Sequence, residues 1–86
     1  MEPAENELAS WVRDVLVAKF DVESASVRPE ARLREDLNLE SLDLVDLVLE
    51  IERRIGRRIE NQDVSDVRTV RDVVLLLARL EGKPAG

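Results

Sequence analysis

Few side chains in this sequence are of a type that carries out chemistry without help. The chain has no Cys and no His, which excludes thiolate zinc sites, cysteine nucleophiles and the commonest general base. Its carboxylates are numerous, but no spacing indicates a buried pair with separated pKa values. Ser41 begins a segment with helical spacing, where a serine taken alone is explained as a helix N-cap. We therefore do not expect an enzyme.

Size and composition limit the chain to one small folded domain. It has 86 residues, 44% hydrophobic and 37% charged, which predicts a single domain over residues 1–86 and is not typical of disordered or membrane proteins. A net charge of −6 and an aromatic fraction of 2% argue against nucleic-acid binding. No apolar run is long enough to span a membrane, and the acidic N-terminus is unlike a secretory signal. We expect a cytoplasmic monomer.

Apolar residues at helical spacing predict an all-α bundle of three main helices and one short helix. We expect helices at about residues 4–20, 41–55, 62–66 and 69–81, with Gly56 and Gly82 as C-terminal stops and Thr69 as the last N-cap. Residues 21–40 are expected to form a long loop, which is unusual in so small a domain and suggests a function. Spaced apolar side chains would hold this loop to the core: Val22, Val27, Leu33, Leu37 and Leu39.

The helix predicted at 41–55 carries two apolar stripes. Projected at about 100° per residue, one stripe faces the core and consists of Leu44, Leu47, Val48, Ile51 and Ile55. The second stripe lies well away from it, beside Ser41, and consists of Leu42, Val45 and Leu49. Asp46 and Glu52 edge this second stripe. It either covers the long loop or forms an exposed docking surface for a partner.

From Glu35 to Glu52 the charge has one sign. Every charged residue in this range is acidic: Glu35, Asp36, Glu40, Asp43, Asp46, Glu50 and Glu52. Basic residues follow at once: Arg53, Arg54, Arg57 and Arg58. An acidic run is usually only a solvated face, but around an apolar stripe it also attracts basic partners and speeds their association.

The stretch from Leu37 to Leu47, LNLESLDLVDL, resembles the signature of acyl carrier proteins. In that family a Leu-Gly-x-Asp-Ser-Leu-(Asp/Glu) segment opens the second helix, and Ser41, Leu42 and Asp43 match its Ser, Leu and acidic positions. The loop upstream and the Thr-Val-x-Asp sequence that begins at Thr69 are also similar. The resemblance covers about residues 5–80.

The resemblance implies a discrete carrier and not a catalyst. Ser41 would carry a 4′-phosphopantetheine arm, transferred from coenzyme A by a phosphopantetheinyl transferase, and the thiol of the arm would hold acyl groups as thioesters. Because this sulfur comes with the prosthetic group, the chain needs no Cys or His of its own. Acyl-loading and condensing enzymes of a synthase pathway would be the other partners. The partner-facing residues would be Glu40, Leu42, Asp43, Val45, Asp46, Leu49, Glu52 and Arg53.

Some positions depart from the family pattern. Asn38 stands where the family usually has Gly, and Asn is the next most tolerant residue for a left-handed backbone. Glu40 replaces the usual Asp, and Arg53 and Arg54 occupy positions that are often acidic in carriers of fatty acid synthesis. These departures predict a specialised pathway, such as polyketide synthesis. Because family members hold acyl chains between their helices, candidate lining residues are Leu44, Val48, Ile59 and Leu76.

Two other functions remain open at this stage. One is an aminoacyl or peptidyl carrier, although such carriers usually show a Gly-Gly-x-Ser segment that is absent before Ser41. The other is a helical adaptor that keeps the carrier fold and acidic face but never takes the arm.

Overall fold

The computed structural model describes residues 3–81. The predicted stop at Gly82 and the ends of the predicted 1–86 domain lie outside these residues. The elements are α1 (Pro3–Phe20), a 3-10 turn η1 (Ser24–Ser26), α2 (Ser41–Ile55), α3 (Asn61–Val64) and α4 (Val70–Glu81). Residues 3–81 contain no strand, only an isolated bridge between Arg32 and Thr69, so the all-α prediction is confirmed. None of these helices is both long and apolar enough to cross a membrane.

The helix boundaries confirm the sequence signals with small corrections. Gly56 ends α2 at a φ of 74°, the left-handed conformation that glycine adopts without strain. The short helix begins at Asn61 and ends at Val64, earlier than the predicted 62–66, because Glu60 is its N-cap and donates its N–H to Asp63 Oδ2 (3.1 Å). The turn at η1 was not predicted, since its three residues bury no side chain.

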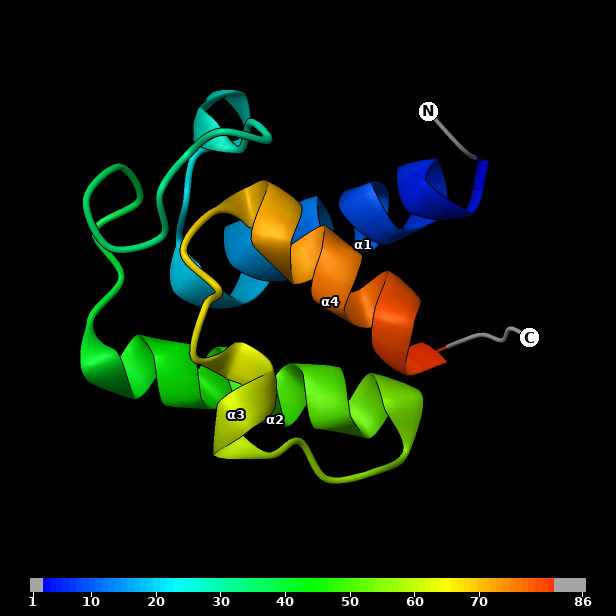
Figure 1. Ribbon diagram of the computed structural model, residues 1–86. Coiled ribbons are helices and arrows are strands. Elements are labelled where there is room, and N and C mark those ends of the chain that lie inside the picture. Colours follow the sequence, from blue (N-terminus) through cyan, green and yellow to red (C-terminus); the bar gives the residue numbers. More distant parts are fainter. Residues whose placement is uncertain (1–2, 82–86) are drawn as a thin grey trace.

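Helix α4 packs against both α1 and α2, and Figure 1 shows it lying between them. The fully buried side chains of the core come mainly from α1 and α4: Val12, Leu16, Val73 and Leu77, joined by Ile51 of α2. Only Leu47 and Ile51 of the predicted α2 core stripe are buried. Leu44, Val48 and Ile55 are half-buried, because α2 covers the core along only part of that stripe. Trp11 is partly buried and packs against the edge of the core.

The long loop before α2 is held by buried side chains and by hydrogen bonds to α4. The five apolar residues predicted to anchor it are buried, and so is Ala31. The N–H groups of Val70 and Arg71 donate to the carbonyls of Ala31 (3.0 Å) and Pro29 (2.9 Å). These donors belong to the first turn of α4 and have no partner within their own helix. The loop carbonyls therefore satisfy free N–H groups at the start of α4, and the same hydrogen bonds hold the loop in place.

A capping arrangement fixes the first turn of α4. Thr69 Oγ1 accepts the N–H of Asp72 (3.1 Å), while Asp72 Oδ2 accepts the N–H groups of Arg68 (2.9 Å) and Thr69 (3.1 Å). This confirms Thr69 as the cap, in the reciprocal pattern of a capping box. The hydrogen bond from the Arg68 N–H, with those from Thr69, lowers the pKa of Asp72 below its usual 3.8.

Candidate functional site

Ser41 is the first residue of α2, and the residue that caps the helix is Glu40. Glu40 has an extended backbone and donates its N–H to Asp43 Oδ2 at 3.0 Å, so that Glu40 and Asp43 form a capping box. The interpretation of Ser41 as an N-cap is therefore wrong, because its neighbour fills that role. Ser41 itself is exposed, and its hydroxyl is left without a capping role.

The backbone just before Ser41 is anchored by an alternation of buried and exposed side chains. Leu37 and Leu39 are buried at 7% and 4% exposure, while Asn38 and Glu40 are exposed. The Leu39 N–H donates to the Leu33 carbonyl (3.0 Å). Asn38 has a φ of 59°, which confirms the left-handed conformation predicted for it and lets the chain turn into α2.

An open depression of about 670 Å³ surrounds Ser41, lined by Arg34, Asn38, Leu39, Glu40, Ser41 and Leu42. The first backbone hydrogen bond of α2 runs from the Leu44 N–H to the Glu40 carbonyl (3.0 Å). The N–H groups of Ser41 and Leu42 precede that bond and have no partner within the helix. Such N–H groups and the positive end of the helix dipole favour an anion. The residues present therefore fit a phosphate esterified to the Ser41 hydroxyl.

The second stripe of α2 is exposed to solvent. Leu42, Val45 and Leu49 are 78%, 56% and 45% exposed. The alternative that these residues cover the long loop is therefore wrong. The apolar side chains of the loop are buried in the core, and its backbone is hydrogen-bonded to the first turn of α4. An apolar stripe on the surface of a highly charged protein is typical of a binding surface.

The charged residues predicted to face a partner differ in what they contact. Glu40 and Asp46 are exposed. Glu52 Oε2 accepts the Ile59 N–H at 2.7 Å, so this carboxylate anchors the connection between α2 and α3. Arg53 contacts Glu50 Oε2 at 3.0 Å but leaves 73% of its side chain exposed. The structure thus gives Glu52 a role within the chain and leaves Arg53 available at the surface.

Sequence analysis missed the role of Arg54. The guanidinium carbon lies 5.1 Å from the centre of the Trp11 ring, and Nε donates to Glu81 Oε2 at 2.6 Å. Arg54 therefore joins α1, α2 and α4 through a cation–π contact and an ion pair. Its position seven residues after buried Leu47 places it beside the core face, but the spacing does not identify Trp11 or Glu81 as its partners.

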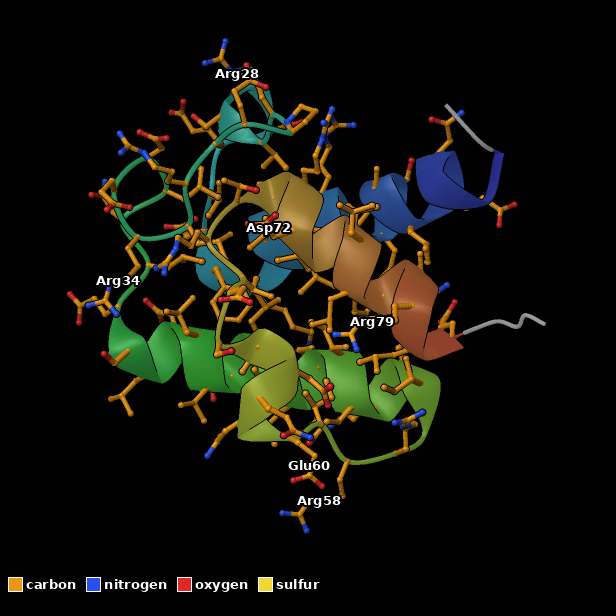
Figure 2. The ribbon with its side chains drawn as sticks, in the orientation of Figure 1. Arg28, Arg34, Arg58, Glu60, Asp72 and Arg79 are labelled. Atoms are coloured by element: carbon orange, nitrogen blue, oxygen red, sulfur yellow. The ribbon has the colours of Figure 1, made fainter. Side chains whose placement is uncertain are left out.

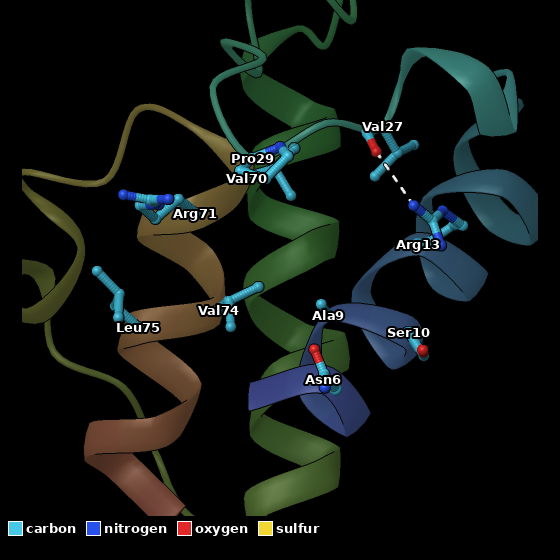
Figure 3. A pocket seen from close by; sticks show the side chains of 10 residues that line it. All are labelled: Asn6, Ala9, Ser10, Arg13, Val27, Pro29, Val70, Arg71, Val74 and Leu75. Carbon is cyan, nitrogen blue, oxygen red and sulfur yellow. Dashed lines mark hydrogen bonds between the residues drawn. The ribbon is translucent and has the colours of Figure 1, made fainter. Parts of the chain in front are cut away.

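A second depression, of about 730 Å³, lies between α1 and α4 and contains one serine, Ser10. Figure 3 shows the Ser10 hydroxyl turned away from Val74 on the opposite wall. Arg13 at its rim donates Nη2 to the Val27 carbonyl (3.4 Å). Because Ser10 lies within α1 and its hydroxyl points outward, this depression does not offer the arrangement found at Ser41.

A third cavity, of about 150 Å³, is lined by apolar side chains of α2, α3 and α4. Three of the four candidate lining residues, Leu44, Val48 and Leu76, line it. Ile59 does not line it and packs half-buried against the core, because its N–H is held by Glu52 in the connection after α2.

Comparisons with known proteins agree with these features. A family model described as "Phosphopantetheine attachment site" matches residues 10–77. Acyl carrier protein 2 of Ralstonia nicotianae is 40% identical over 70 residues, which cover 81% of this chain and 86% of that protein. An acyl carrier protein of Thermotoga maritima is 36% identical over 76 residues, or 88% of this chain and 94% of that protein. A crystal structure of an acyl carrier protein from Thermotoga maritima matches with a TM-score of 0.74 at 25% identity, covering 88% of each chain.

Acyl carrier proteins are carriers and not catalysts, and they interact with phosphopantetheinyl transferases and synthase enzymes. Their phosphopantetheine-binding domain carries a covalently attached 4′-phosphopantetheine, which supplies the thiol that this chain lacks. The family model and the alignments with these relatives each cover most of the chain. The chain belongs to the acyl carrier protein family.

Proposed function

We propose that Ser41 is the residue that carries the 4′-phosphopantetheine arm. The observation that carries this proposal is an exposed serine at the first position of α2 whose capping role is taken by Glu40. The open depression around Ser41 and the N–H groups of the first turn support it, because they leave room for a phosphate and favour its charge.

Intact mass measurement tests this assignment. The apo protein is incubated with coenzyme A, Mg²⁺ and a promiscuous phosphopantetheinyl transferase. The wild type and Ser10→Ala should each gain one phosphopantetheine, and Ser41→Ala should gain none. A modified Ser41→Ala would place the arm on another side chain. A wild type that stays unmodified under these conditions would favour the unmodified adaptor.

We infer that the second stripe of α2, with Glu40, Asp43 and Asp46 beside it, is the surface that docks partner enzymes. Its three apolar residues are exposed and lie on the helix that begins at Ser41, so a partner covering the stripe is also beside the arm. The acidic side chains attract a basic partner, and this attraction weakens as salt increases.

We further propose that the pathway served is a specialised one, such as polyketide synthesis, and not bulk fatty acid synthesis. The support is Arg53, which is exposed near the end of α2. A partner that fits a wholly acidic helix has a basic surface. Arg53 would repel that surface, because like charges brought together in an interface are unfavourable.

Charge reversal at Arg53 tests this assignment. Arg53→Glu should raise kcat/KM for loading by a malonyl transferase of fatty acid synthesis. Arg28→Glu is the matched control, since Figure 2 shows Arg28 at the end of the molecule opposite α2. Equal kinetics for the wild type and both variants would contradict the proposed selectivity.

The cavity between α2, α3 and α4 supports an acyl cargo of limited length. Its volume is about 150 Å³, and an apolar cavity of this size holds a molecule as large as benzene, which corresponds to roughly six carbons. The lining is apolar, so it offers no partner to an amino group. We therefore expect loading assays to show short acyl groups accepted and aminoacyl groups rejected.

A further inference from the structure

We propose that Arg34 holds the phosphate of the arm on Ser41 through an ion pair, and so acts as a positioning residue for the prosthetic group. This inference rests on the proposed attachment at Ser41. Its basis is that a phosphate esterified to a serine hydroxyl must lie within one covalent bond of that oxygen, so its place is fixed by the place of Ser41.

The backbone places Arg34 beside the segment that leads into α2. The residue before it, Leu33, donates its N–H to the Arg68 carbonyl (2.8 Å) and accepts the Leu39 N–H (3.0 Å). Two residues after Arg34, Asp36 Oδ2 accepts the Arg32 N–H (2.8 Å). These contacts close a compact turn on both sides of Arg34 and bring it next to residues 38–41.

Arg34 lies at the same depression as Ser41. Both residues line it, and Figure 2 shows Arg34 beside the first turn of α2. Neighbouring arginines of the loop are paired, Arg28 with Glu30 (3.8 Å) and Arg32 with Asp36 (3.5 Å). Within residues 3–81, Arg34 takes part in none of the six ion pairs, so its guanidinium is available.

The charges around Ser41 indicate what the guanidinium of Arg34 does there. A phosphodiester carries a negative charge, and Glu40 and Asp43 in the same turn are acidic. Of the six residues that line the depression, Arg34 is the cation. A guanidinium matches two phosphate oxygens at once. Arg34 therefore offsets the repulsion from the capping pair and fixes the direction in which the arm leaves α2.

A cycle of variants with and without the arm tests the proposal. Apo and holo forms of the wild type, Arg34→Gln and Arg58→Gln are prepared, and each holo form is confirmed by intact mass. Arg58→Gln removes the same charge from the connection after α2, at a distance from Ser41. In low salt, the change in Tm on adding the arm should be less favourable in Arg34→Gln than in the wild type by about 1–5 °C. This difference should shrink in 1 M salt. The Debye length there is about 3 Å, so the attraction between the guanidinium and the phosphate is largely screened.

The phosphorus resonance of the holo protein provides a second readout that reports directly on the phosphate. It should move in Arg34→Gln and stay unchanged in Arg58→Gln. Equal Tm changes and equal phosphorus resonances in all three proteins would overturn the role of Arg34. A wild type that takes no arm would instead overturn the attachment at Ser41, and the inference about Arg34 with it.

Discussion

Truncation of Leu42 removes the most exposed apolar side chain of the second stripe. Leu42 is 78% exposed in the free protein, so Leu42→Ala should change the free energy of unfolding very little. Docking that covers the side chain would bury about three carbon groups that alanine lacks, each worth about 0.8 kcal/mol. Scaled by the exposed fraction, the loss of binding free energy is about 2 kcal/mol, or roughly a 25-fold increase in Kd.

Titration calorimetry with the phosphopantetheinyl transferase measures this change. Leu75→Ala is the matched control, because Leu75 is a second exposed leucine, at 48%, but lies on α4. We expect its Kd to stay within about twofold of the wild type, as for a residue outside the interface. A Leu42→Ala variant that binds like the wild type, or a Leu75→Ala variant that binds as weakly as Leu42→Ala, would refute the assignment of the docking surface.

Three further predictions concern the elements that position the site. Asn38→Val should destabilise the protein by about 1–2 kcal/mol, measured by urea unfolding, because a β-branched residue is strained at positive φ; Asn38→Gly should not. Asp72 has a pKa below its unfolded value, so its stabilisation is present above about pH 4 and is lost as pH falls through the folded pKa. Asp72→Asn should therefore show a smaller drop in Tm between pH 7 and pH 3 than the wild type, and an equal drop would contradict this. Arg54→Gln should cost about 1–2 kcal/mol in thermal unfolding by removing the Trp11 contact and an ion pair, with Arg54→Lys less affected; no loss would show that the contact contributes nothing.

Much of the site could be predicted because its signals are local. The left-handed conformation at Asn38, the stop at Gly56 and the cap at Thr69 each depend on a residue and its near neighbours in sequence. The exposed stripe of α2 followed from helical periodicity, although the sequence left open whether the loop would cover it. The capping residue of α2 was missed, since Ser41 and Glu40 can both accept a backbone N–H and only the observed backbone shows which one does.

The sequence by itself determined where the helices run and that a serine opens an acidic helix. These properties follow from contacts between residues three or four positions apart, which a linear pattern records. The tertiary structure alone decided that α2 buries only two of its five core candidates, that Arg54 stacks on Trp11, and that Arg34 lies beside Ser41. The first two depend on how distant helices pack, and the third depends on the Leu39–Leu33 hydrogen bond that folds the loop back. Such contacts join residues whose distance apart in the sequence carries no periodic signal.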